Sequence, residues 1–304
     1  MRICVVGVGA IGGLYAAHLA QLEDVEVWGY DVSAEHVAAI NRDGLRLTGA
    51  ADLVGRLEAR TDAAEIPPCE LGIVAVKAAF TGPAMAATAG VFAAGAVCSV
   101  QNGIGSEEVV AEHVARVIRG VCLPAGHVTA PGVVNMDAPG TTWIGPFEPA
   151  PAGAAEIAAL GDALNRAGMP TVVEADARGA QWTKLLFNAS TNPLAALTGL
   201  THGELCDRPA LRATITALVD EGRAVAEALG ITLDSDPDGL ISRAAVENHD
   251  HRPSMLQDAA AHRPTEIDAL NGGIVRAGAG AGVPTPLHAA IAALIAGLEA
   301  GWKD

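Results

Sequence analysis

Three glycines with the spacing GxGxxG, at residues 7, 9 and 12, follow a short apolar run at 2–6 and open a segment of helical spacing at 10–22. The first glycine of such a motif permits a tight turn, and the second lets the backbone approach a pyrophosphate. The third lets the helix pack closely on the strand, with the phosphate at the helix N-terminus. The motif therefore predicts a dinucleotide-binding loop. Its expected contacts are Gly7, Gly9, Ala10, Ile11 and Gly12.

The next strand-like run, 25–30, is followed by an acid, Asp31, nineteen residues after Gly12. A carboxylate at this position accepts hydrogen bonds from a ribose 2′-OH and repels a 2′-phosphate. The following residues, VSAEHVAAI, contain no Arg or Lys. NAD is therefore favoured over NADP as the cofactor. In the alternative interpretation Asp31 caps the helix that follows, a role that Ser33 fills equally well.

Strand-like and helical segments alternate through the first half of the chain, with buried-strand candidates at 2–6, 25–30, 71–77 and 96–103. This alternation predicts an α/β fold with a parallel, doubly wound sheet. After residue 176 the segments have helical spacing, with Gly or Pro near their ends. We therefore expect a Rossmann-type dinucleotide-binding domain over 1–175 and an all-helical C-terminal domain over 176–304.

The charge balance limits the partners, because 35 acidic and 19 basic residues give a net charge of −16. Such a surface disfavours nucleic acid and anionic membranes, whereas one local cation is enough to bind a small anionic acid. Five cysteines without a CxxC pair indicate a reduced, cytoplasmic protein. The uncharged run 3–22 resembles a signal peptide or membrane span in length, but its glycines argue against both. The nine scattered histidines predict no metal site.

A polar stripe interrupts an apolar segment at 183–199, where Lys184, Asn188 and Asn192 are spaced four residues apart. On a helix this spacing places them along one face. Burying them without partners costs several kcal/mol, so we expect a ligand or another part of the protein to pair with them. Alternatively, Lys184 extends its head to water along an apolar surface. Pro193 disfavours the helical conformation at Asn192, so the stripe is expected to end there at a kink.

Several separated motifs together resemble the ketopantoate reductase (2-dehydropantoate 2-reductase) family, a 6-phosphogluconate-dehydrogenase-like group with a Rossmann domain and a helical domain. The resemblance covers nearly the whole chain. It rests on GVGAIGG (7–13), VAVKA (74–78), QNGIGSEE (101–108), APGVV (130–134), KLLFNASTNPLAALTG (184–199), SMLQD (254–258) and TEIDALNGGIVRAG (265–278).

The resemblance implies a role for each matching residue. Lys184 matches the catalytic lysine and general acid, and Glu266 matches the acid that contacts the substrate hydroxyl. Lys77 matches a lysine that helps to hold the cofactor phosphate in NADP-dependent members. The positions that match contacts with substrate or cofactor are Asn102, Asn188, Asn192 and Ser254.

Each of these residues also has a purely structural interpretation. Glu266 follows Pro264 and would stabilise a helix N-terminus. Ser254 would be an N-cap, and Asn102 would belong to a turn with Gly103. His202 stands where well-studied members have an asparagine near the substrate, so it either contacts substrate or lies in a surface loop.

Three functions follow from these observations. The first is reduction of a branched 2-keto acid, by default 2-dehydropantoate, with a nicotinamide cofactor. The second is an NAD-dependent 2-hydroxy-acid dehydrogenase on the same scaffold, and the third is a non-catalytic dinucleotide sensor. The apolar last helix, PLHAAIAALIAGLEAG, is expected to cover either the core or a homodimer interface.

Overall fold

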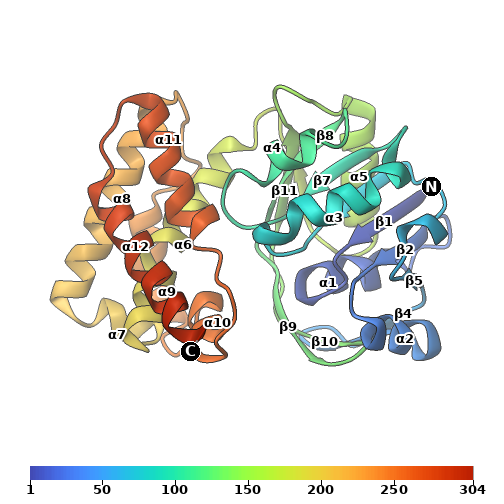
Figure 1. Cartoon of the computed structure of the whole chain (residues 1–304), viewed down its shortest axis with the longest axis horizontal. Coiled ribbons are helices and arrows are strands. Elements are labelled where there is room, and N and C mark those ends of the chain that lie inside the picture. The colour runs from blue at the N-terminus through green and yellow to red at the C-terminus, as the bar shows by residue number, and fades with distance from the viewer. Residues whose placement is uncertain (304) are drawn as a thin grey trace. The chain divides into compact units, whose positions relative to one another are not determined.

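The computed structural model describes residues 1–303, which divide into two compact units (Figure 1). The first unit comprises residues 1–101 and 106–177, and the second takes residues 102–105 together with the chain from Arg178 onward. The expected boundary after residue 175 lies two residues before this division. The sequence did not predict that the short segment 102–105 belongs to the helical unit.

An eight-stranded sheet is the centre of the first unit, in the order β12-β11-β8-β7-β6-β1-β2-β5. All neighbouring strands are parallel except β8 and β11. The order departs in both directions from β1, which is the arrangement of a doubly wound fold and confirms the predicted class. The strands are β1 (Arg2–Val6), β2 (Glu26–Tyr30), β5 (Glu58–Arg60), β6 (Leu71–Val74), β7 (Ala96–Ser99), β8 (Val117–Cys122), β11 (Thr142–Pro146) and β12 (Thr171–Val173).

A second sheet, of four strands in the order β4-β3-β10-β9, belongs to the same unit. Its strands are β3 (Leu45–Gly49), β4 (Leu53–Gly55), β9 (Ala125–Ala130) and β10 (Val133–Ala138). The sequence did not predict this sheet. It approaches helix α1 (Ala10–Leu19) closely, because a Cβ atom at Gly13 would lie 2.9 Å from Val134 and one at Gly55 would lie 2.5 Å from Ala17 Cα.

Helix α1 therefore contacts both sheets, and Leu14, Tyr15 and Leu19 are fully buried. A helix that is covered on all sides is apolar all round. This burial explains the uncharged run 3–22, which forms β1 and α1. Across the residues that the structure describes, no helix combines the length and the apolarity needed to cross a bilayer. The other helices of this unit are α2 (Ala34–Asp43), η1 (Ala63–Glu65), η2 (Ala78–Phe80), α3 (Thr81–Thr88), η3 (Ala89–Phe92), α4 (Ser106–Ala111) and α5 (Ala154–Arg166).

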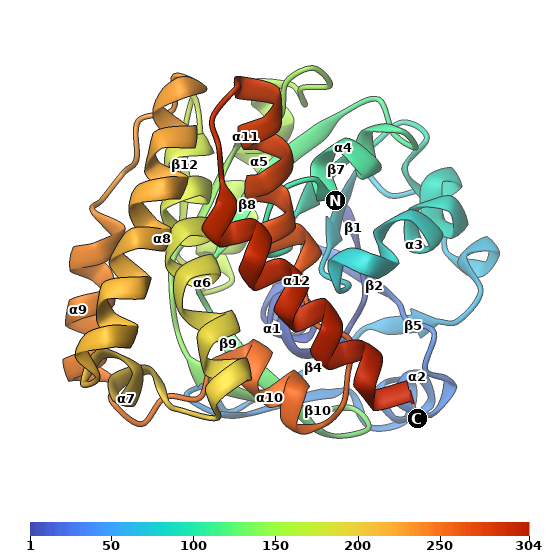
Figure 2. The ribbon, with the colours of Figure 1, turned by 60° about the vertical axis from the view of Figure 1, so that its left-hand side comes forward.

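The second unit is built around α6 (Arg178–Thr198), which packs against α8 (Pro209–Ala228), α10 (Ser254–Ala260) and α12 (Pro286–Ala300) (Figure 2). Its apolar core includes Leu186, Ile215, Leu218, Ile274 and Ile295, all fully buried. The remaining elements are α7 (His202–Cys206), α9 (Pro237–Glu247), the π-helix η4 (Asp268–Gly272), α11 (Gly273–Ala281) and η5 (Gly301–Lys303). The all-helical prediction for this half is confirmed.

Candidate active site

The glycine loop has the geometry that its spacing predicts. Gly7 has φ +86°, a conformation that residues with a side chain rarely adopt, and a Cβ atom there would lie 2.6 Å from Val76 Cγ1. A Cβ atom at Gly12 would lie only 1.9 Å from the Gly7 carbonyl oxygen. Around Gly9, by contrast, a Cβ atom would meet nothing within 4 Å. Gly9 is also the N-cap of α1 and provides no side-chain cap, so the loop suits a pyrophosphate at this helix end.

Asp31 follows β2 directly and holds the glycine loop in place. Its Oδ2 accepts a hydrogen bond from the Val8 N–H at 3.0 Å, and its Oδ1 accepts one from the Ser33 N–H at 2.9 Å. Ser33 itself is the N-cap of α2, so the capping interpretation of Asp31 is wrong. Carboxylate oxygens have further lone pairs, and those of Asp31 suit the hydroxyl groups of a ribose.

The loop after β6 places Lys77, which is half-buried and is the N-cap of η2. Gln101 fixes this loop, because its Nε2 donates to the Val76 carbonyl at 2.8 Å and to Thr81 Oγ1 at 2.7 Å. Gln101 was not among the expected site residues. The available signal was an amide side chain at the end of a buried strand, directly before the Asn-Gly pair.

The segment 102–105 is bound to the helical unit by its backbone. Gly103 has φ +86°, and a Cβ atom there would lie 2.4 Å from the Ala269 carbonyl oxygen. The Ile104 N–H donates to that same oxygen at 3.1 Å, and Gln181 Nε2 donates to the Gly103 carbonyl at 3.3 Å. Asn102 is therefore more than part of a turn, since these contacts hold it beside η4.

Asn102 and Glu266, 164 residues apart, form a hydrogen bond in which Asn102 Nδ2 donates to Glu266 Oε2 at 2.9 Å. Glu266 is half-buried and lies just before the π-helix η4, whose Leu270 N–H donates to the Glu266 carbonyl. The backbone is held from the other side, because the Thr265 N–H donates to Glu299 Oε1 at 2.8 Å. The carboxylate of Glu266 thus interacts with a side chain from another segment, unlike a simple first-turn acid.

Lys184 and Asn188 are half-buried on α6, whereas Asn192 is buried with 6% of its surface exposed. The Asn192 Oδ1 atom accepts a hydrogen bond from Thr191 Oγ1 at 3.2 Å. The helix continues through Pro193 to Thr198, so the expected end of the stripe is wrong.

A side chain from η4 explains this continuity. Proline has no N–H, so Pro193 leaves the carbonyl of Ala189, four residues earlier, without its helical donor. Asn271 Nδ2 donates to this carbonyl at 3.0 Å, and the same Nδ2 lies 3.0 Å from His288 Nδ1. His288 Nε2 in turn donates to the Leu218 carbonyl at 3.0 Å. Burial lowers the pKa of His288, which favours the neutral ring that this chain of hydrogen bonds requires.

Two further expectations differ from the structure. Ser254 is the exposed first residue of α10, and the N-cap of that helix is Pro253, so the capping interpretation of Ser254 is wrong. His202 lies at the start of α7 and is 2% exposed, so it is not a surface-loop histidine. Its ring stacks on Phe187 with centroids 5.3 Å apart, and its Nε2 lies 3.2 Å from the Ile241 carbonyl.

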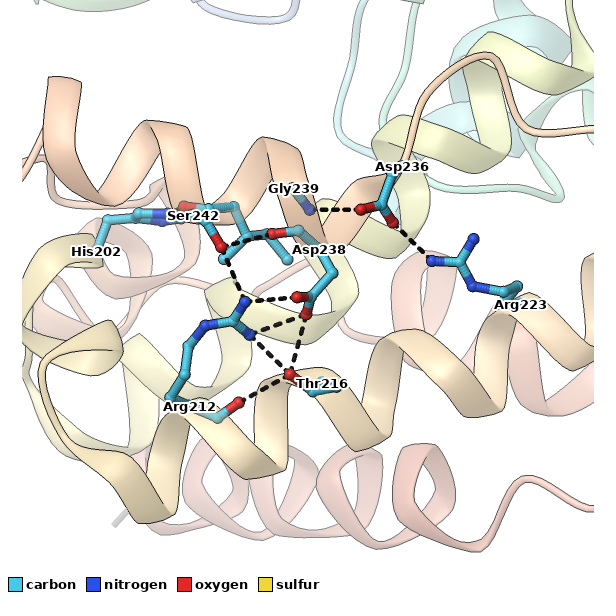
Figure 3. Close-up of polar contacts among 9 residues, drawn as sticks. His202, Arg212, Thr216, Arg223, Asp236, Asp238, Gly239 and Ser242 are labelled. Carbon is cyan, nitrogen blue, oxygen red and sulfur yellow. Dashed lines mark hydrogen bonds and ion pairs between the residues drawn. The ribbon is translucent and has the colours of Figure 1, made fainter.

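An ion pair between α8 and α9 fixes α9, the helix whose Ile241 carbonyl contacts His202 (Figure 3). Arg212 binds both carboxylate oxygens of Asp238, at 2.9 and 2.6 Å, and also donates to Ser242 Oγ. The Arg212 guanidinium lowers the pKa of Asp238. Burial, the largest cause, lowers the pKa of His202, so its neutral form packs between α6 and α9.

Comparisons with known proteins agree along the whole chain. The family described as ketopantoate reductase PanE/ApbA matches residues 3–149, and its C-terminal counterpart matches residues 176–299. The 2-dehydropantoate 2-reductase of Pyrococcus abyssi is 32% identical over 302 residues, which cover 99% of this chain and 98% of that protein. The corresponding enzyme of Halobacterium salinarum is 31% identical, covering 97% of this chain and 98% of that protein.

Solved structures give the same result. A PanE/ApbA family ketopantoate reductase from Ralstonia eutropha JMP134 superimposes with a TM-score of 0.90 at 30% identity, over 100% of both chains. D-mandelate dehydrogenase in a ternary structure with NADH and anilino(oxo)acetate gives a TM-score of 0.89 at 25% identity, also over 100% of both chains. With both family regions matched and relatives above 30% identity over its length, the chain belongs to the ketopantoate reductase PanE/ApbA family, whose members are nicotinamide-dependent oxidoreductases.

Proposed function

We propose that the protein reduces a branched 2-keto acid, 2-dehydropantoate in the first instance, to the 2-hydroxy acid with NADH. The observation that carries this proposal is the hydrogen bond of 2.9 Å between Asn102 and Glu266. It joins the side chains of two motifs that are 164 residues apart in the sequence. The relatives named 2-dehydropantoate 2-reductase support the choice of substrate.

Lys184 is the general acid in this proposal. The chain has 3 lysines among its 19 basic residues, so a lysine on α6 is not the usual cation of this protein. An arginine stays protonated at all relevant pH values, whereas a lysine in a partly desolvated site can give up its proton. Lys184 would polarise the keto oxygen and then protonate it as the alcohol forms. The bound nicotinamide would supply the hydride.

Glu266 and the neutral polar groups orient the substrate. Asn102 holds Glu266 Oε2, so the direction of the carboxylate is set before a substrate hydroxyl arrives to donate to it. Asn188, Asn192 and Ser254 contribute amide and hydroxyl groups, which can bind a carboxylate without adding a second positive charge.

The first unit holds the cofactor in this proposal. The open space at Gly9 and the N-terminus of α1, with Ala10 and Ile11, receive the pyrophosphate. Asp31 accepts from the ribose hydroxyl groups and favours NAD over NADP. Lys77 lies in the loop that Gln101 fixes and is a second cofactor contact.

A second candidate function is oxidation of a 2-hydroxy acid with NAD. Two points favour it: the Asp31 carboxylate at the end of β2 suits a free ribose rather than a 2′-phosphate, and D-mandelate dehydrogenase with NADH has the same fold at a TM-score of 0.89. Lys184 would then act as the base rather than the acid, on the same scaffold.

Location and assembly belong to the same proposal. We place the enzyme in the cytoplasm, where its five cysteines, which form no disulfide, stay reduced. A homodimer through α12 would use only the outer face of that helix, because His288, Ile291 and Ile295 already pack into the core of the helical unit.

Initial rates with 2-dehydropantoate, measured with NADH and NADPH in parallel, test both parts of the proposal. Fast turnover that prefers NADH supports the reductase and the role of Asp31. Turnover that prefers NADPH contradicts the cofactor assignment alone. If 2-dehydropantoate is not reduced but D-mandelate is oxidised with NAD, the second candidate replaces the first.

A further inference from the structure

A cavity of about 320 Å³ lies beside the glycine loop, and its two sides come from different parts of the first unit. Residues of the loop, of the end of β2 and of α2 form one side: Gly9, Asp31, Ser33 and His36. Strands β9 and β10 form an antiparallel hairpin. The turn of this β9–β10 hairpin and the adjoining end of β9 form the other side of the cavity: Val128, Thr129, Ala130 and Pro131. Strand β9 and the turn that follows it, which belong to the second sheet, therefore contribute four of the eight lining residues.

His36 connects these two sides. It is 6% exposed, and each ring nitrogen has a partner: Nε2 lies 2.9 Å from the Val8 carbonyl oxygen, and Nδ1 accepts from the Gly132 N–H at 3.0 Å. With Nδ1 as an acceptor, the proton sits on Nε2, which donates to Val8. A neutral imidazole thus spans the distance from the glycine loop to the turn of the hairpin.

Val8 of the glycine loop, whose carbonyl contacts His36, also binds Asp31. The Val8 N–H donates to Asp31 Oδ2, while the Val8 carbonyl accepts from His36. The turn packs tightly on α2, because a Cβ atom at Gly132 would lie 3.0 Å from the Ala39 Cβ atom. Hydrogen bonds therefore connect Asp31, the glycine loop and the hairpin. A shift of the hairpin would change the position of the Asp31 carboxylate.

The charge of the lining selects among ligands. Its eight residues include one carboxylate, Asp31, and neither lysine nor arginine. A neutral ribose diol can donate to this carboxylate, whereas a 2′-phosphate would meet a negative charge without a cation on either side.

We propose that the β9–β10 hairpin, positioned by His36, is the second wall of the ribose site and a determinant of cofactor choice in addition to Asp31. This inference rests on the proposed dinucleotide function and extends it to a segment about a hundred residues beyond the glycine motif. The ligand class is the adenosine ribose of NAD(H), with free 2′- and 3′-hydroxyl groups.

Thr129→Arg tests the wall, because Thr129 is exposed on the lining and an arginine there supplies the missing cation. Dissociation constants of NADH and NADPH, measured by titration calorimetry without keto acid, should show NADPH binding tightened about tenfold relative to NADH. Thr129→Gln adds length without charge and should leave the ratio unchanged. His127→Arg adds charge on the same strand outside the lining and should do the same. An unchanged ratio in Thr129→Arg, or an equal change in His127→Arg, overturns the proposal.

His36→Phe tests the connection, since it keeps a ring of similar size without either hydrogen bond. We expect weaker binding of both cofactors by about fivefold to tenfold and faster amide exchange at Gly132 in the cofactor-free protein. Unchanged exchange and unchanged NADH affinity contradict the role of His36. These binding measurements contain no keto acid, so they do not depend on the proposed reaction. If the protein binds NADH but does not reduce 2-dehydropantoate, the proposed reaction is wrong, whereas the inference about the ribose site is unaffected.

Discussion

In the first unit the groups proposed to meet the ligand are mainly backbone groups, at Gly9, Ala10 and Ile11, with Asp31 as their side-chain neighbour. In the helical unit they are side chains from separate segments, among them Asn102 from a loop, Lys184 from α6 and Glu266 from the residues just before η4. A site made of backbone groups depends on glycines at the few positions where a side chain would clash or block the ligand. A side-chain site is encoded by packing between segments, so substitutions should act differently in the two units.

Lys184→Ala should produce the largest effect on catalysis. If it does not, the contrast between backbone contacts in the first unit and side-chain contacts in the helical unit is wrong. Removing a general acid lowers kcat about 10²- to 10⁴-fold. The affinity for NADH, measured by titration, should stay nearly constant because the proposed cofactor contacts lie in the other unit. Lys77→Ala is the matched control and should weaken cofactor binding while leaving kcat nearly unchanged. Near-normal turnover of Lys184→Ala would remove its catalytic role.

Gly12→Ala and Gly9→Ala should separate folding from binding within one loop. At Gly12 the added Cβ atom would lie 1.9 Å from a backbone oxygen, so the free energy of unfolding should fall by about 3 kcal/mol. At Gly9 the space is open, so stability should change by about 1 kcal/mol or less while NADH binding weakens about tenfold. Urea titration and calorimetry measure the two effects. Equal stability losses would contradict the geometry.

The first unit could largely be predicted because its information is local. The glycine spacing and Asp31 lie within 25 consecutive residues, and alternating strands and helices indicate the sheet class directly. The four-stranded sheet was missed because it pairs short strands from 45–55 and 125–138, whose glycines resemble turn signals. Its function as a cavity wall could not be predicted without that pairing.

The helical unit could be predicted in outline, but its local details could not. His202 was expected to contact substrate, because the resemblance places an asparagine near the substrate at that position, or to lie in a surface loop. Packing against Phe187, which the sequence does not show, decides its burial. The polar stripe of α6 was expected to end at a kink because a proline disfavours the helical conformation of the residue before it, here Asn192. The compensating donor, Asn271, lies 78 residues further along the chain, and only the tertiary structure brings it to Ala189.

Asn102→Leu should give an intermediate effect that tests whether side chains from separate segments act together. Without the donor, Glu266 loses a charge-assisted hydrogen bond, and kcat should fall about tenfold with little change in NADH affinity. Gln181→Leu removes another contact of the same loop, at Gly103, and serves as the control for loop position. If the Gln181 variant loses as much activity as the Asn102 variant, loop placement rather than the Glu266 contact explains the effect.

Asn271→Leu should destabilise the protein by about 1–2 kcal/mol, because the Ala189 carbonyl is then buried without a donor. In a Pro193→Ala background the helix supplies its own N–H at residue 193, so the same substitution should cost about 1 kcal/mol less. Urea denaturation of the four proteins of this cycle measures the coupling. A coupling of zero would show that Asn271 stabilises through His288 alone.

His202 should give the smallest effect, seen in the pH dependence of stability. Burial lowers its pKa in the folded protein below the unfolded value of about 6.5. The unfolded state therefore binds more protons below that pH, and the stability contribution present above it is lost as the pH falls toward the folded pKa. Tm should drop as the pH falls below about 6.5. His202→Phe should reduce this drop, and His288 should be responsible for part of the remainder.

His249 provides the control of opposite sign. Its ring contacts Asp207 at 2.9 Å and Asp250 at 3.0 Å, and these carboxylates raise its pKa. Its contribution is therefore fully present below the unfolded pKa and is lost as the pH rises through the folded one. His249→Gln should enlarge the drop in Tm on acidification, by less than His202→Phe reduces it, because His249 is exposed and solvent screens its ion pairs. If both variants changed the drop in the same direction, burial would not be the cause of the His202 effect.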